Sequence, residues 1–72
     1  MLKTTTELQS IIKVGGGVSV DGKSKTTTEL QSLASIANVS GATLLVRNVG
    51  SKTTSELQNI ARLAPGKVIF EL

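Results

Sequence analysis

The sequence lacks cysteine, histidine, tryptophan and tyrosine, and phenylalanine and proline occur once each. Without cysteine there is no disulfide, no thiolate nucleophile and no zinc–thiolate site. Without histidine the chain lacks the commonest general base and metal ligand. A single aromatic residue leaves almost no surface on which unpaired nucleic-acid bases could stack. We therefore expect a protein that is not an enzyme, holds no cofactor or metal and reads no nucleic-acid sequence.

Charge and long apolar runs are also limited. Eight basic and five acidic residues give a net charge of +3 over 72 residues, which permits an anionic partner without requiring one. No run approaches the ~18 apolar residues of a membrane span, and the first residues lack the apolar stretch of a secretory signal. These absences favour a cytoplasmic protein with no membrane partner. Because a chain this short gains little stability from one core, association between copies is expected from size alone.

One short segment occurs three times. Its copies are KTTTELQS at 3–10 and at 25–32, and KTTSELQN at 52–59. The copies start 22 and then 27 residues apart, a spacing typical of stacked supersecondary units. We therefore expect one domain, residues 1–72, built of three repeats at about 3–24, 25–51 and 52–72.

Each copy of the segment carries the signal for a helix start. A threonine stands three residues before a glutamate in every copy, as the pairs Thr4/Glu7, Thr26/Glu29 and Thr53/Glu56. In this capping box the hydroxyl accepts a hydrogen bond from the glutamate N–H, and the carboxylate accepts one from the threonine N–H. The pattern predicts three helices that begin at these threonines.

Apolar residues follow each cap at the i, i+3, i+4, i+7 spacing of one buried helix face. They are Leu8, Ile11 and Ile12; Leu30, Leu33, Ala34 and Ala37; and Leu57, Ile60, Ala61 and Ala64. Turn-forming residues then predict the helix ends at 15–17, 38–41 and 65–66. The middle repeat is about one helical turn longer than the first, so its helix is expected to end near Ala37 or Asn38.

A strand is predicted after each helix, at 18–21, 44–47 and 68–72. The order αβαβαβ with crossovers of this length favours parallel strands connected in a right-handed sense. We expect an α/β mini-solenoid, with a three-stranded parallel sheet in the order 1-2-3 and all three helices on one face. This architecture resembles the curved solenoids of leucine-rich repeat proteins, whose repeat spacing the sequence lacks. The tandem K-T-T-x-E-L-Q unit resembles short bacterial proteins built of the same α/β repeat, and that resemblance implies no activity.

Strand alternation predicts which residues the sheet turns away from the helices. If Val18, Val20, Leu44, Val46, Val68, Phe70 and Leu72 face the helices, a different set faces solvent. That set is Ser19, Leu45 and Ile69 in one row, and Asp21, Arg47 and Glu71 in the next. The row of charges fits either a solvated ion-pair ladder or the rim of a self-association face with an apolar centre. Asp21 and Glu71, on outer strands roughly 9–10 Å apart, are too common an arrangement to indicate catalysis.

Two patterns in the sequence are typical of phosphate binding, a glycine-rich motif and a set of lysines. Residues 17–24 match G-x-x-x-x-G-K-[ST], but the four middle positions alternate as a strand and cannot also wrap a phosphate. Lysines near the helix starts provide a second pattern: Lys3, Lys23, Lys25 and Lys52. Helix N-termini that share one edge attract anions, although the capping boxes already use two donors of each helix.

The sequence favours a non-enzymatic structural or protein-interaction module that self-associates. Both outer strands would present unpaired backbone groups, and no repeat differs from the others in the way that a capping repeat does. A homo-oligomer is expected, with a dimer favoured. The alternative is weak binding of phosphate or another polyanion, such as a nucleic-acid backbone, along the lysine edge.

Overall fold

Three helices alternate with three strands along the chain, as predicted. The computed structural model describes residues 4–72. Its elements are α1 (Thr5–Lys13), β1 (Val18–Asp21), α2 (Thr27–Ser40), β2 (Leu44–Arg47), α3 (Thr54–Arg62) and β3 (Val68–Phe70). The strands form one parallel sheet in the order β1-β2-β3, which confirms the expected α/β topology.

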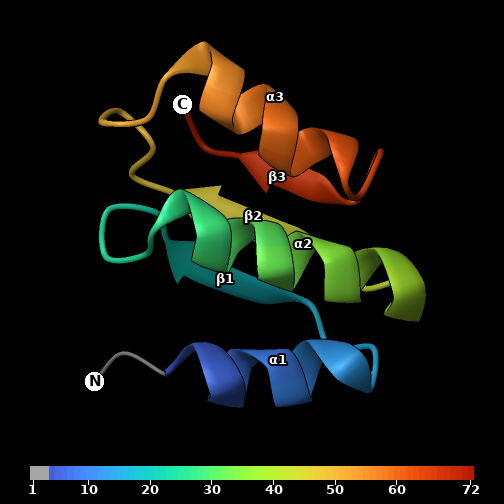
Figure 1. The fold of residues 1–72 in the computed structure, drawn as a ribbon. Coiled ribbons are helices and arrows are strands. Elements are labelled where there is room, and N and C mark those ends of the chain that lie inside the picture. The colour runs from blue at the N-terminus through green and yellow to red at the C-terminus, as the bar shows by residue number, and fades with distance from the viewer. Residues whose placement is uncertain (1–3) are drawn as a thin grey trace.

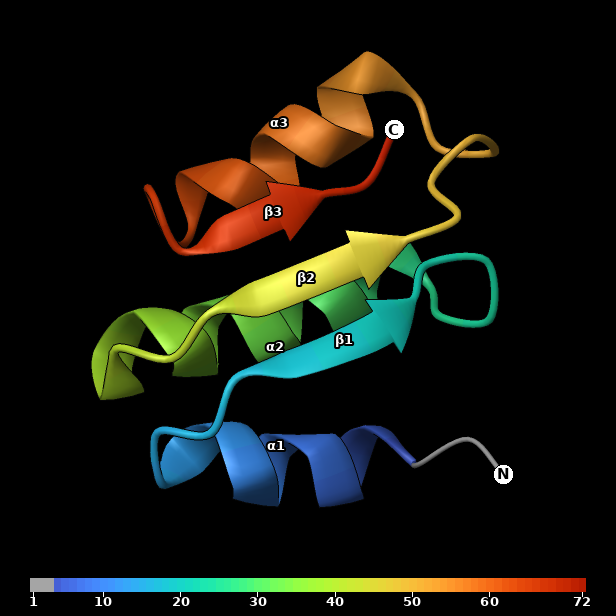
Figure 2. The ribbon, with the colours of Figure 1, turned by 180° about the vertical axis from the view of Figure 1, so that it is seen from behind.

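The helices lie on one side of the sheet. In Figure 1 α2 passes in front of β1 and β2, and from behind the same strands pass in front of α2 (Figure 2). The flanking helices α1 and α3 lie at opposite ends of this layer (Figure 1). Neighbouring helices need about 8–10 Å between axes and neighbouring strands only about 4.8 Å. The helix layer is therefore wider than the sheet, and the repeats fan out.

All three predicted capping boxes are present. Thr26 Oγ1 accepts from the Glu29 N–H at 3.1 Å, and Glu29 Oε1 accepts from the Thr26 N–H at 2.9 Å. The same two bonds begin α1 and α3. The cap threonine has extended backbone angles in each case, so the helices begin where the repeated segment predicts.

The core lies between the sheet and the helices, and most of it was predicted. Fully buried side chains come from both layers, among them Leu30, Leu33, Ile60, Leu44 and Val46. Val18, Leu57, Val68 and Phe70 are partly buried against this cluster. With the exception of Leu72, the residues expected to face the helices do so on all three strands.

The structure corrects four details. The helix α2 ends at Ser40, because Gly41 is the first residue with a left-handed φ (+81°). The strand β3 ends at Phe70, and Leu72 is 98% exposed instead of facing the helices. Ile11 was expected in the buried face of α1, yet it is 40% exposed. Within the described residues 4–72, no element packs against this side of α1 as α1 packs against α2.

Candidate self-association surfaces

The six residues predicted for the open sheet face are brought together. Ser19, Leu45 and Ile69 are partners across the three strands, and Asp21 pairs with Arg47 in the next row. Glu71 continues this second row just beyond β3, where its N–H donates to the Val46 carbonyl at 2.9 Å. Leu45 is half-buried and Ile69 is 50% exposed. The face thus has a small apolar centre beside charged groups.

The charged row does not form the expected ion-pair ladder. Arg47 Nε donates to Ser19 Oγ at 2.8 Å. Asp21 Oδ1 accepts from Asn48 Nδ2 at 3.1 Å and from the Lys23 N–H at 3.0 Å. These two bonds, in that order, lower the pKa of Asp21 from its ordinary value of 3.8, with the charge of Arg47 a smaller cause. Hydrogen bonds therefore organise the row, and the charges stay solvated.

The lysine edge is the predicted anion-binding set Lys3, Lys23, Lys25 and Lys52, and three of these four lysines lie within the described residues. Lys3 lies outside the described residues. Lys25 and Lys52 immediately precede the caps of α2 and α3 and are half-buried, and Lys23 is exposed in the turn after β1. The carboxylates of the capping boxes stand among these lysines, so part of the positive charge is neutralised where an anion would bind.

Two hydrogen bonds between the helix N-termini of neighbouring repeats were not anticipated from the sequence. Thr5 Oγ1 donates to Glu29 Oε2 at 2.8 Å, and Thr27 Oγ1 donates to Glu56 Oε2 at 3.0 Å. The hydroxyl that follows each cap thus binds the cap glutamate of the next repeat. A signal was available, because this second threonine is kept in all three copies although a capping box does not need it.

The cap glutamates are held in the ionised form by these bonds. The Thr26 N–H is the largest cause that lowers the pKa of Glu29 from 4.5, and the Thr5 hydroxyl is the next. For Glu56 the Thr53 N–H is the largest cause and the Thr27 hydroxyl is again the next. Each glutamate therefore joins its own cap to the preceding repeat.

Burial shows that every repeat has two different sides. We call the side that bears the threonine after the cap the forward side. Thr5 and Thr27 are half-buried, whereas their counterpart Thr54 is exposed. The glutamine four residues further on behaves in the same way, because Gln9 and Gln31 are half-buried and Gln58 is exposed. In repeats 1 and 2 the next repeat covers the forward side, and no further repeat covers that of the third within residues 4–72.

The opposite, backward side shows the reverse pattern. Glu29 and Glu56 are half-buried and Glu7 is exposed. Seven residues after each cap stands an apolar side chain, and Leu33 and Ile60 are fully buried there while Ile11 is 40% exposed. The first repeat therefore exposes the side that the other two bury.

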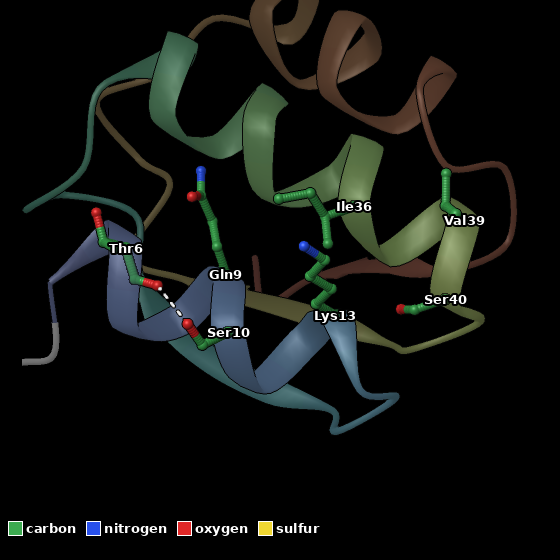
Figure 3. A pocket seen from close by; sticks show the side chains of 7 residues that line it. All are labelled: Thr6, Gln9, Ser10, Lys13, Ile36, Val39 and Ser40. Carbon is green, nitrogen blue, oxygen red and sulfur yellow. Dashed lines mark hydrogen bonds between the residues drawn. The ribbon is translucent and has the colours of Figure 1, made fainter.

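A groove separates α1 from α2. The last turn of α2 extends past the end of α1 (Figure 1). The groove between the two helices is open to solvent and has a volume of about 530 Å³. Its walls include Thr6, Gln9, Ser10 and Lys13 from α1, and Ile36 and Val39 from α2 (Figure 3). Ser10 Oγ donates to the Thr6 carbonyl at 3.2 Å. One lysine among neutral side chains provides no acid–base pair in this groove.

Residues 4–72 contain neither a candidate metal site nor a candidate membrane-spanning helix. That part of the chain holds no group of three or more carboxylate side chains placed to bind a metal ion. None of its helices has the length and apolar character needed to cross a membrane. Comparison with protein-family models, curated proteins and solved structures gives no match to this chain.

Proposed function

We propose that the chain is a non-enzymatic structural or protein-interaction module that associates with copies of itself. The observation that supports this most is that β1 and β3 are both edge strands of a three-stranded sheet. An edge strand has a row of unpaired N–H and C=O groups and pairs readily with another strand. The apolar centre at Leu45 and Ile69 adds contact area next to these edges.

Size gives a second reason. The described domain buries its core on one side of a small sheet and leaves the other side open. A domain of this size has a narrow stability margin, which binding of a further copy would widen by mass action. Association would therefore protect the edges and stabilise each subunit at once.

The test is the mass in solution over a dilution series, from millimolar to low micromolar chain, by light scattering coupled to gel filtration. We expect the mass to exceed that of one chain at the upper end and to fall towards it on dilution. Far-UV circular dichroism at both ends should show unchanged helix content. A single-chain mass at every concentration would refute the proposal.

A second candidate is weak binding of phosphate or a nucleic-acid backbone along the lysine edge. It is supported by Lys25 and Lys52, which directly precede the N-termini of two helices that run in the same direction (Figure 1). Amide NMR shifts at residues 23–28 and 52–55 should move when inorganic phosphate or a short DNA duplex is added at low salt, and should return with added salt. Shifts that do not move at low salt would exclude this candidate.

A further inference from the structure

We propose that copies of this chain join head to tail, with the forward side of the third repeat against the backward side of the first repeat in the next copy. This inference rests on the proposed self-association and names its surfaces. The contact would repeat the interface that already joins repeat 1 to repeat 2 and repeat 2 to repeat 3. Its partner is therefore a second copy of the same chain.

The two exposed sides match in polar chemistry. Within the chain, the hydroxyl after the cap donates to the next cap glutamate twice, at 2.8 and 3.0 Å. In the third repeat Thr54 is that residue, and its exposed hydroxyl makes no hydrogen bond within residues 4–72. Glu7 of the next copy is the matching acceptor. Glu7 already has partners within its own chain, and its Oε1 accepts from the Thr4 N–H and hydroxyl. A carboxylate has about four acceptor positions, so the bond from Thr54 is added to these interactions and replaces none of them.

The apolar positions match as well. Ala34 follows Thr27 by seven residues and Ile60 follows Glu56 by four, so each lies on the helix face that meets the neighbouring repeat. Both side chains are fully buried. Their counterparts at the free ends are Ala61, which is half-buried, and Ile11, which is 40% exposed. The same two residue types, alanine and isoleucine, thus stand at the same helix positions. Bringing the ends together would bury both, as the internal contact does.

On β1, the free edge carries the backbone groups of Ser19 and Asp21. The Val18 N–H donates to the Thr43 carbonyl at 3.1 Å, so the backbone N–H and C=O groups of the even-numbered residues of this strand point towards β2. Backbone groups of successive strand residues point to opposite sides. The N–H and C=O groups of Ser19 and Asp21 are therefore directed away from β2. The Asp21 carbonyl already accepts from the Ser24 N–H at 3.2 Å and from the Ser24 hydroxyl at 3.0 Å, so the groups open to a further strand are those of Ser19 and the Asp21 N–H.

On β3, the free edge carries the groups of the even-numbered residues. The Lys67 carbonyl accepts from the Leu44 N–H at 2.8 Å, so the backbone N–H and C=O groups of the odd-numbered residues point towards β2. The backbone groups of Val68 and Phe70 point to the free edge, while their side chains pack against the core. In the internal register, position 18 aligns with 44 and 44 with 68. Placing Val68 beside Val18 of the next copy interleaves the outward groups of both strands in parallel.

A symmetric pair does not use these features. A two-fold axis would place like sides together, so that hydroxyl meets hydroxyl or glutamate meets glutamate. Joining unlike sides satisfies both, and each added copy again exposes the same two sides. Such a heterologous contact produces a ring or an open filament, so a pair of chains would be the first step of assembly instead of its end.

The decisive experiment blocks one end at a time. Ala61→Arg places a long charged side chain on the forward side of α3, and Ile11→Glu places a charge on the backward side of α1. Each variant alone should have a single-chain mass at a concentration where the unmodified chain associates. An equimolar mixture should have the mass of two chains, because each variant keeps the end that the other has lost. Asn38→Arg and Ser10→Glu are matched charge controls at exposed positions and should associate as the unmodified chain does.

The possible results separate the mode from the function. If the blocked variants still associate alone, or their folded mixture stays at single-chain mass, the head-to-tail mode is wrong while self-association stands. If the unmodified chain never associates, both proposals fail. Circular dichroism must first show native helix content in both variants; if one is unfolded, the cysteine pair below decides the mode.

Engineered cysteines report the register directly, since the chain has none of its own. Ser19→Cys and Ile69→Cys lie on the open face, and the proposal makes them strand neighbours in different copies. Their Cα atoms would then lie within the roughly 4.4–6.8 Å that a disulfide allows. Oxidising the mixture should give a mixed disulfide that neither variant forms with itself and that Leu45→Cys does not form with Ile69→Cys. A predominant Ile69→Cys homodimer would overturn the proposal.

Discussion

The same isoleucine-to-alanine change in two repeats measures what one repeat does for its neighbour. Ile60 and Ile11 occupy the same position after their caps, but Ile60 is fully buried and Ile11 is 40% exposed. Truncating a fully buried isoleucine removes its transfer free energy and leaves a cavity, which together cost about 2–5 kcal/mol. At Ile11 the lost carbons were partly in water already and the space opens to solvent. Its cost should be roughly 1–2 kcal/mol at ~0.8 kcal/mol per buried carbon.

Urea unfolding followed by far-UV circular dichroism suits this comparison, because the chain has neither tryptophan nor tyrosine. A domain this small has a total stability of only about 5 kcal/mol, so Ile60→Ala could be largely unfolded in plain buffer. All variants should therefore be measured in the same stabilising osmolyte, at a concentration where the unmodified chain is a single chain. Ile60→Ala should then unfold at much lower urea than Ile11→Ala.

Equal costs for the two variants in dilute solution would refute the reasoning, because Ile11 would then be as well covered as Ile60 without any partner. Concentration supplies a further check. If copies stack as proposed, Ile11 becomes buried in the assembly and its truncation should weaken association. Ile60→Ala should leave the association of the folded fraction unchanged.

Three further outcomes are expected. Thr26→Ala removes a cap acceptor and should cost about 0.5–2 kcal/mol, whereas Thr28→Ala, one residue before Glu29 and exposed, should change urea stability little; equal effects would contradict the capping role. Because hydrogen bonds lower the folded pKa of Glu29 and Glu56 below 4.5, their contribution to stability is complete above the unfolded pKa and is lost as pH falls through the folded value. The melting temperature should therefore decrease as the pH is lowered below about 4.5. Glu29→Gln should make this decrease smaller; an unchanged dependence of melting temperature on pH would show that Glu29 is not responsible. Gly41→Ala must adopt a φ of +81° and should cost about 1–2 kcal/mol, while Gly50→Ala, with open space and no positive φ, should be neutral or slightly stabilising in the same unfolding assay.

Local rules were sufficient for most of the fold. Short-range spacing predicts the capping boxes, the strand register and the parallel order. Each of these signals occurs in all three repeats. Ile11 was missed for a different reason. Its helix pattern is the same as that of Ile60, but no repeat within residues 4–72 packs against the side of α1 that carries it. Exposure at the ends of a stack depends on what lies next to it, which helix periodicity does not contain.

The ion-pair ladder expected in the charged row is absent for a similar reason. Alternation placed Asp21, Arg47 and Glu71 in one row, but it did not predict that Asn48 and the Lys23 N–H would bind Asp21 first. Both groups come from the turns after the strands, where backbone conformation decides which donor is closest. Exposed ion pairs contribute little in water, so a local hydrogen bond with good geometry takes precedence.

The repeated threonine after each cap joins these observations. Helix capping explains Thr26 and Glu29 but gives no reason for Thr27, whose hydroxyl reaches the next repeat. If this position only had to form a helix, alanine would make the repeat at least as stable as threonine does, because alanine has the higher helix propensity. The third repeat keeps the threonine at Thr54, where no following repeat is present among the residues that the structure describes. If stacking of copies is what Thr54 serves, Thr54→Val should leave the urea midpoint of the dilute chain unchanged and weaken association. Thr5→Val should instead lower the midpoint and spare association. Equal effects of both variants on both measurements would remove this argument.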